Sequence, residues 1–154
     1  MQEKYTIVSS EKELKEHYTK SEIIEFLHKN LEQFRDPPDE IEKAIDYAFS
    51  NAEGKGGFIV LQEMNDELVG VVVINQTGMN GYIPDNILVY IATDSGKAPL
   101  GAGAKVMQHA MDTAEGDIAL HVEYHNSAKK MYEKLGFKSK YAEMRYVKNT
   151  DDKK

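Results

Sequence analysis

A glycine-bearing turn at the start of a helical pattern is the part of this chain best suited to chemistry. Residues 94–115 read DSGKAPLGAGAKVMQHAMDTAE, and they follow an apolar run, Ile87–Ala92, that is typical of a strand. The first turn of a helix leaves backbone N–H groups unpaired, and the helix dipole favours negative charge there. The spacing therefore predicts a site for phosphate or pyrophosphate, to which the neighbouring Lys97 could add a flexible positive charge.

The glycine pair Gly101 and Gly103 does not fit the two common nucleotide-binding motifs. A dinucleotide fingerprint needs a third glycine at position 106, which is Val106 here, and the GKS or GKT ending of a P-loop is missing. Rossmann and P-loop sites are therefore excluded. Two interpretations of the glycines stay open from the pattern alone, namely anion binding and tight packing of a helix on a strand.

Strand and helix patterns predict the elements that must position this turn. Apolar or alternating runs predict strands at Tyr5–Val8, Phe58–Gln62, Leu68–Asn75, Ile87–Ala92, Ile118–Tyr124 and Tyr141–Val147. Capping signals and helical spacing predict helices from Glu11, from about Ser21, from Asp36–Asp39, after the glycine turn, and over Asn126–Leu135. The apolar run at residues 69–74, VGVVVI, favours a central strand covered on both faces. The fold class is α/β (α+β), with helices on both faces of a central mixed sheet.

Composition narrows the function classes. A chain of 154 residues is long enough for one domain, predicted over residues 1–148, with a frayed charged tail at 149–154. The absence of cysteine removes thiol nucleophiles, disulfides and cysteine metal sites, and we expect no metal. A net charge of −7 argues against nucleic acid as a partner. No signal-peptide pattern or long apolar run is present, so we expect a cytoplasmic protein with no membrane partner.

A second motif lies further along the chain, where residues 126–128 read NSA and residues 132–137 read YEKLGF. Together with the strand and glycine turn before them, these motifs resemble the acyl-CoA-binding core of the GNAT superfamily of N-acetyltransferases. In that family a bulged strand leads into a glycine-rich turn and helix, then a diverging strand, then a helix ending in a YxxxGF signature. The resemblance covers residues 88–137 and implies a single GNAT-like domain whose mostly antiparallel sheet contains a splayed parallel strand pair.

The resemblance also implies where acetyl-CoA, the co-substrate, would bind. Its pantetheine arm is expected to pair with the backbone of Ile91 and Thr93. Its pyrophosphate is expected on the backbone N–H groups of Leu100, Gly101, Ala102, Gly103 and Ala104, and Asn126 is expected to be a further cofactor-binding residue. The family usually has Arg or Gln, then often Gly, at the two positions that hold Ala98 and Pro99 here.

Direct attack of an amine on the thioester needs a base for the amine and a proton for the leaving thiolate. The resemblance implies Tyr132 as the proton donor, although its helical spacing also fits a core aromatic residue. Glu123 is the first candidate for the base and His121 the second, because strand alternation would place them on one face of the strand. The alternative for both residues is a solvated polar position on a half-exposed strand.

The predicted activity is therefore acetyl transfer from acetyl-CoA to an amine on a small molecule or peptide. Two alternatives stay open: a CoA-binding sensor or interaction module that does not catalyse, and a structural domain with a coincidental glycine turn. The acceptor would be chosen by the helices at residues 11–52 and the loop Thr77–Asn86, and a homodimer remains an open option.

Overall fold

The computed structural model describes residues 2–149, and the chain divides into two compact units. The first unit ends at Leu120, and the second begins at His121. The single domain expected over residues 1–148 stays a prediction. In the part of the chain that the structure describes, no helix is both long enough and apolar enough to cross a membrane.

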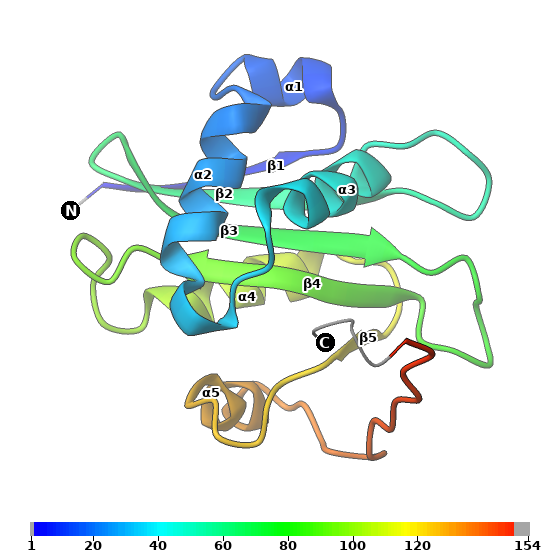
Figure 1. The fold of residues 1–154 in the computed structure, drawn as a ribbon. Helices are drawn as coiled ribbons and strands as arrows, with labels where there is room; N and C mark the ends of the chain where they lie inside the picture. The colour runs from blue at the N-terminus through cyan, green and yellow to red at the C-terminus, as the bar shows by residue number, and fades with distance from the viewer. Residues whose placement is uncertain (1, 150–154) are drawn as a thin grey trace. The chain divides into compact units, whose positions relative to one another are not determined.

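The first unit contains one five-stranded sheet, shown in Figure 1. Its strands are β1 (Glu3–Val8), β2 (Gly57–Met64), β3 (Glu67–Gln76), β4 (Asn86–Thr93) and β5 (Ile118–Leu120). They lie side by side in chain order; neighbours are antiparallel up to β4, and β5 runs parallel to β4. Positive φ angles at Asn65 and Asp66, 51° and 68°, make the tight turn of the predicted β2–β3 hairpin.

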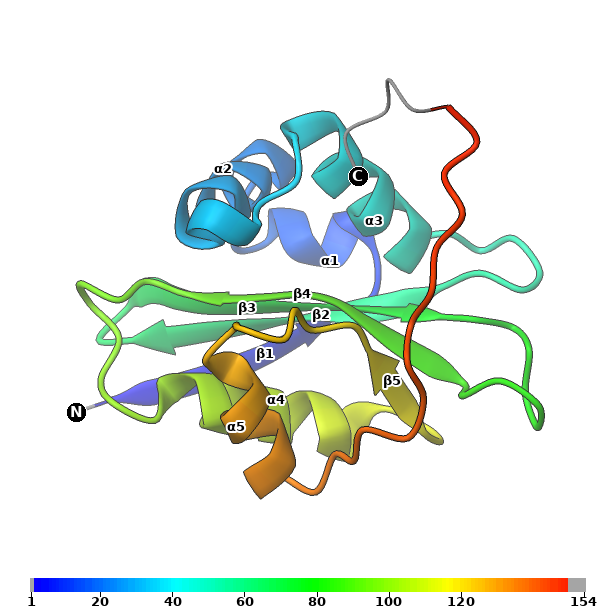
Figure 2. The same ribbon diagram turned by 60° about the horizontal axis from the view of Figure 1, so that its bottom comes forward.

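Helices cover both faces of this sheet, as predicted (Figure 2). One face carries α1 (Glu11–Lys15), α2 (Lys20–Asn30), the short 3₁₀ helix η1 (Glu32–Phe34) and α3 (Pro38–Ala48), and the other face carries α4 (Ala102–Thr113). Helix α1 begins at Glu11 as predicted and is capped by Ser10, whose Oγ accepts a hydrogen bond from the N–H of Glu13 at 3.1 Å.

Helices α2 and α3 begin close to their predicted starts, but their N-caps are other residues than expected. Helix α2 is capped by Thr19 and not by Ser21, because Thr19 and Glu22 form a complete capping box two residues earlier. Helix α3 begins at Pro38 with the extended Pro37 before it, so Asp36 lies outside the first turn. Its Oδ2 atom accepts a hydrogen bond from the Tyr90 hydroxyl instead, at 2.7 Å.

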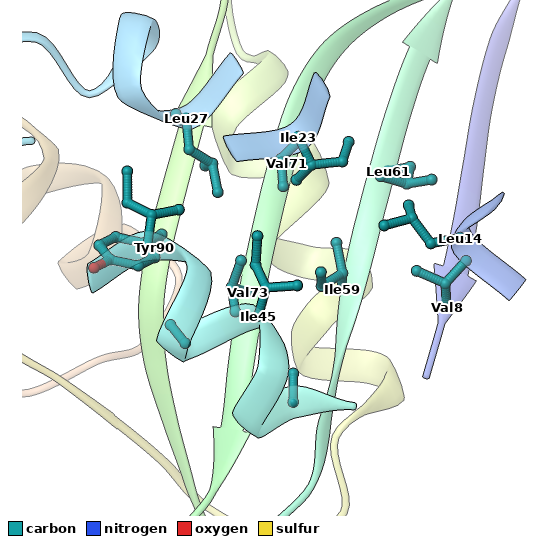
Figure 3. Packing of buried hydrophobic residues seen from close by; sticks show 14 residues of the cluster. Val8, Leu14, Ile23, Leu27, Ile45, Ile59, Leu61, Val71, Val73 and Tyr90 are labelled. Atoms are coloured by element: carbon teal, nitrogen blue, oxygen red, sulfur yellow. The ribbon is translucent and has the colours of Figure 1, made fainter. Parts of the chain in front are cut away.

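The main hydrophobic core lies between the sheet and helices α1–α3 (Figure 3). It contains alternate residues of the strands, among them Ile59, Leu61, Val71 and Val73, together with apolar residues of the three helices. On the opposite face α4 buries Val106, Met107 and Ala110. Residues 71–74 are all fully buried, as expected for a central strand with both faces covered.

Two irregularities in β4 shape the edge of the sheet. Val73 pairs with Tyr90 but Ile74 pairs with Leu88, so Val89 has no partner on β3 and forms a bulge. The parallel pairing with β5 covers only Asn86–Leu88, and β4 continues beyond it to Thr93. The bulged strand and the parallel pair that separates after a short contact agree with the predicted fold.

The second unit contains the helix α5 (Ala128–Lys134), which is shorter than the predicted Asn126–Leu135. Strand β5 ends at Leu120 and not at Tyr124, and the strand expected over Tyr141–Val147 is absent from the described residues 141–147. A strand needs a neighbour that satisfies its backbone groups, and the described part of this unit contains only one helix and loops. The prediction for β5 was therefore too long and the strand predicted over Tyr141–Val147 was wrong, because β propensity alone does not supply a partner.

Candidate functional site

The glycine turn opens directly into α4 in the first unit. Gly101 is the N-cap residue and has a left-handed backbone, with φ of 88° and ψ of −1°. Only glycine adopts this conformation without strain, and a Cβ there would have no other atom within 4 Å. The shape of the turn therefore depends on the left-handed backbone of Gly101. The space that a Cβ of this residue would occupy is open.

Several N–H groups of this turn point away from the protein's own acceptors. The N–H of Ala102 is bonded to the carbonyl of Pro99 at 3.1 Å, and that of Lys105 to the carbonyl of Gly101 at 3.2 Å. The N–H groups of Gly101, Gly103 and Ala104 have no acceptor among residues 2–149. These three donors at the positive end of a twelve-residue helix suit an anion such as pyrophosphate.

One residue of the predicted cradle differs from what the sequence suggested. Ala102 was expected to offer its N–H, but that group already bonds to Pro99. The side chain of Leu100 is fully exposed, and the expected contribution of its backbone N–H stays a prediction.

The predicted pantetheine residues lie on the free edge of β4. The N–H of Asp94, which follows the strand, donates to Val69 of β3 at 2.8 Å. Backbone groups of successive residues in a strand point to opposite edges, so those of Thr93 and Ile91 face away from β3. Among residues 2–120 no strand pairs with this stretch of the edge, because β5 ends beside Leu88. The edge and the anion-binding turn therefore follow one another along the same unit.

Lys97 is placed at the turn but is already paired. Its Nζ lies 2.9 Å from Oε2 of Glu67, with both side chains more than half exposed. The hydrogen bond to Glu67 raises the pKa of Lys97, which keeps the amine charged. An exposed ion pair of this kind exchanges readily with another anion.

Tyr132 lies on α5 in the second unit and is 6% exposed. Its ring packs edge-on against Phe137, with centroids 5.7 Å apart and planes at 67°. Burial raises the pKa of Tyr132 to about 12, because the low-dielectric surroundings disfavour the phenolate. The hydroxyl therefore keeps its proton at neutral pH.

Asn126 begins the turn before α5. Its Oδ1 accepts a hydrogen bond from the N–H of Ala128 at 2.9 Å, and its carbonyl accepts one from Lys129 at 3.1 Å. The side-chain oxygen of Asn126 therefore satisfies the first N–H of the helix that carries Tyr132.

The two candidate bases are exposed. Glu123 and His121 follow the end of β5, so the strand alternation that would have aligned them is absent. The carbonyl of Glu123 accepts the N–H of Asn126 at 2.9 Å, and its carboxylate lies 3.6 Å from Nε2 of His125. Both candidates sit in the loop before α5 and are accessible to water.

The loop predicted for the acceptor side lines an open polar cavity of about 520 Å³ in the first unit. Its walls include Gly78, Asn80 and Asp85 of that loop, and Glu115 and Gly116 beyond α4. It lies at the Asn86 end of β4, opposite to the glycine turn, so it is not continuous with the anion site.

One residue that contacts the turn was missed by the sequence prediction. Gln62 stands in an otherwise apolar strand pattern, GFIVLQEM, and is buried beneath the first turn of α4. A polar residue at an inward-facing strand position was the available signal.

Comparisons with known proteins identify a family and a shared fold. The model of the acetyltransferase (GNAT) family matches residues 13–137. Among curated proteins, none matches the chain.

Solved structures share the fold. The ribosomal-protein-S18-alanine N-acetyltransferase of Escherichia coli is 16% identical, with a TM-score of 0.61 over 96% of this chain and 86% of that one. Naa50 of Arabidopsis thaliana, in complex with the bisubstrate analogue CoA-Ac-MVNAL, is 18% identical, with a TM-score of 0.59 over 87% and 83%. An aminoglycoside acetyltransferase from an uncultured soil metagenomic sample, in complex with sisomicin, is 11% identical, with a TM-score of 0.58 over 96% and 95%.

Proposed function

Because the chain belongs to the acetyltransferase (GNAT) family, we propose that it transfers an acetyl group from acetyl-CoA to an amine. The observation that carries this proposal is the anion-ready turn of α4, which directly follows the free edge of a bulged β4. A pyrophosphate fits the turn because the N–H groups of Gly101, Gly103 and Ala104 are available. The outward backbone of Ile91 and Thr93 offers the amide partners that a pantetheine arm requires.

The reaction we propose is direct attack by the neutral amine on the thioester carbonyl. A C–N bond forms, the C–S bond breaks, one proton leaves the amine, and one proton goes to the CoA sulfur. Tyr132 is the donor of the second proton in this scheme, supported by its buried, protonated hydroxyl. Glu123 is the proposed base, with His121 as the alternative, and their exposure favours proton transfer through water.

The acceptor is proposed to be an amine on a small molecule or peptide. The E. coli structure is named for an alanine of a ribosomal protein, the Arabidopsis structure holds a peptide-bearing analogue, and the metagenomic enzyme holds sisomicin. The fold therefore accommodates both acceptor sizes, and the choice between them rests on this chain's own helices α1–α3 and loop 77–86.

Two experiments test the proposal in order: a binding titration and an activity assay. Isothermal titration with acetyl-CoA should show saturable binding, and an absence of binding at millimolar ligand would refute any CoA-dependent function. Thiol release from acetyl-CoA should then rise on addition of one class in a panel of primary amines. Tight CoA binding with no thiol release for any amine would support the alternative, a CoA-binding sensor or interaction module.

A further inference from the structure

Gln62 of β2 connects the sheet to the first turn of α4. Its side chain is completely buried, and its Nε2 donates to the carbonyl of Ala102 at 3.0 Å and to the Tyr5 hydroxyl at 3.2 Å. Ala102 is the first residue of α4 and directly follows Gly101, the N-cap. A single buried amide therefore bonds to the backbone at the point where the free N–H groups begin.

The strand pairing beneath this contact is irregular. Gln62 pairs with Gly70, but Glu63 pairs with Leu68, so Val69 is unpaired and the ladder is interrupted at Gln62. A bulge of this kind redirects the side chain beside it. A Cβ built on Gly70 would overlap Oε1 of Gln62, so only glycine leaves room for the amide to lie across β3 toward the helix.

A gain in stability does not explain why the side-chain amide of Gln62 is buried here. Oε1 of Gln62 is buried and has no hydrogen-bond partner among the described residues. A buried polar atom without a partner costs free energy, and an apolar side chain of similar size would avoid that cost. The two directed bonds from Nε2 are what an apolar residue would not supply.

Other contacts attach α4 to β1 further along the helix. Nζ of Lys105 lies 2.9 Å from Oε2 of Glu3, and the ring of His109 stacks on Tyr5 with centroids 3.8 Å apart and planes at 13°. These contacts act one and two turns after the N-cap. In the first turn, the contact is the hydrogen bond from Gln62 to the carbonyl of Ala102, and Gln62 also bonds to Tyr5, the residue on which His109 stacks.

We infer that Gln62, with Gly70 opposite it, is a positioning residue that fixes the N-terminal turn of α4 for the pyrophosphate of CoA. The inference rests on the proposed function, since it assigns a residue to the same anion site. Gln62 does not touch the ligand and acts through the carbonyl of Ala102.

The test compares ligands with and without the pyrophosphate. For Gln62→Leu, one lost backbone contact should raise the Kd for CoA by about tenfold. The Kd for pantetheine, which lacks the pyrophosphate, should stay within about twofold of wild type, and the unfolding midpoint should change little. Gln108→Leu is the matched control, because Gln108 lies on the same helix, is exposed, and bonds to Asp112 on that helix. It should leave both affinities unchanged.

Gly70→Ala provides a second, independent variant. Its Cβ should displace the Gln62 amide and weaken CoA binding, but the same change should cost far less affinity in a Gln62→Ala background, where the overlapping Oε1 is gone. Wild-type CoA affinity in Gln62→Leu, or equal losses for CoA and pantetheine, would overturn the inference. If wild type binds no CoA, the proposed function fails together with it. CoA binding that is insensitive to Gln62 refutes the inference alone.

Discussion

Replacing Gly101 by alanine should weaken CoA binding by more than its effect on folding explains. The left-handed backbone of Gly101, with φ of 88°, costs a non-glycine residue about 1–2 kcal/mol. Restriction of the unfolded chain by alanine offsets part of this, by about 0.4–1 kcal/mol. Because no atom lies within 4 Å of the new Cβ, no clash adds to the cost, and the net loss in unfolding free energy should be roughly 1 kcal/mol.

The loss in CoA binding free energy should be larger than this loss in unfolding free energy and should have a separate cause. The alanine Cβ lies on the open side of the turn, where the phosphate oxygens would approach the N–H groups of Gly103 and Ala104. Loss of one charged hydrogen bond is worth about 1.5–3 kcal/mol, which corresponds to at least a tenfold rise in Kd. Isothermal titration with CoA measures this change, and urea unfolding measures the stability of the same preparation.

Gly54→Ala is the matched control. Gly54 has φ of 81° and likewise no atom within 4 Å of a built Cβ, but it lies in the loop before β2. It should lose the same unfolding free energy, roughly 1 kcal/mol, and bind CoA as wild type does. If Gly101→Ala and Gly54→Ala bind CoA equally well, the turn of α4 is not the pyrophosphate site.

Three further predictions address the acid, the core and the turn. Tyr132→Phe should lower kcat by about 100-fold or more and leave the affinity for CoA nearly unchanged. Because the pKa of Tyr132 is about 12, wild-type kcat should show no alkaline loss from this group below about pH 11. An equal loss of CoA binding in the variant would mark Tyr132 as a packing residue only. Tyr90→Phe removes the 2.7 Å hydrogen bond to Asp36 and should cost about 1–3 kcal/mol in urea unfolding. Burial raises the pKa of Tyr90 above its usual 10.0, so wild-type stability should fall as pH rises above 10.0 and fall less steeply in the variant; parallel pH curves would contradict this assignment. Lys97→Ala should leave the unfolding midpoint unchanged, because the ion pair between Lys97 and Glu67 is exposed. The variant should bind CoA more weakly than wild type, with a larger difference at low salt than at high salt. A loss of affinity that does not depend on salt would refute a charge contact from Lys97.

The sequence predicted most of the first unit because its signals are local. Alternation and continuous apolar runs identified β1 to β4, and the glycine turn before α4 follows from a helix start that needs no distant partner. The family resemblance added what periodicity lacks, a bulged strand and a splayed parallel pair, and the structure places the bulge at Val89 and the short parallel contact between β4 and β5. Both are now visible in the strand register.

The remaining features depend on partners that are remote in the chain. Asp36 stands before two prolines and looks like a helix cap, yet it accepts a hydrogen bond from Tyr90, 54 residues away. Gln62 reaches Ala102 across 40 residues, through a gap that exists only because Gly70 lacks a side chain. No window of local sequence contains these pairs. The segment 141–147 shows the opposite error, since its β pattern is strong and the described part of its unit provides no strand to pair with.

The central claim is acetyl transfer, and it is tested most directly by following an isotope-labelled acetyl group from acetyl-CoA to an amine by mass spectrometry. Wild type should give labelled N-acetyl product and free CoA in equal amounts, and Tyr132→Phe should give both at a strongly reduced rate. Binding of acetyl-CoA without labelled product for any amine would contradict this claim.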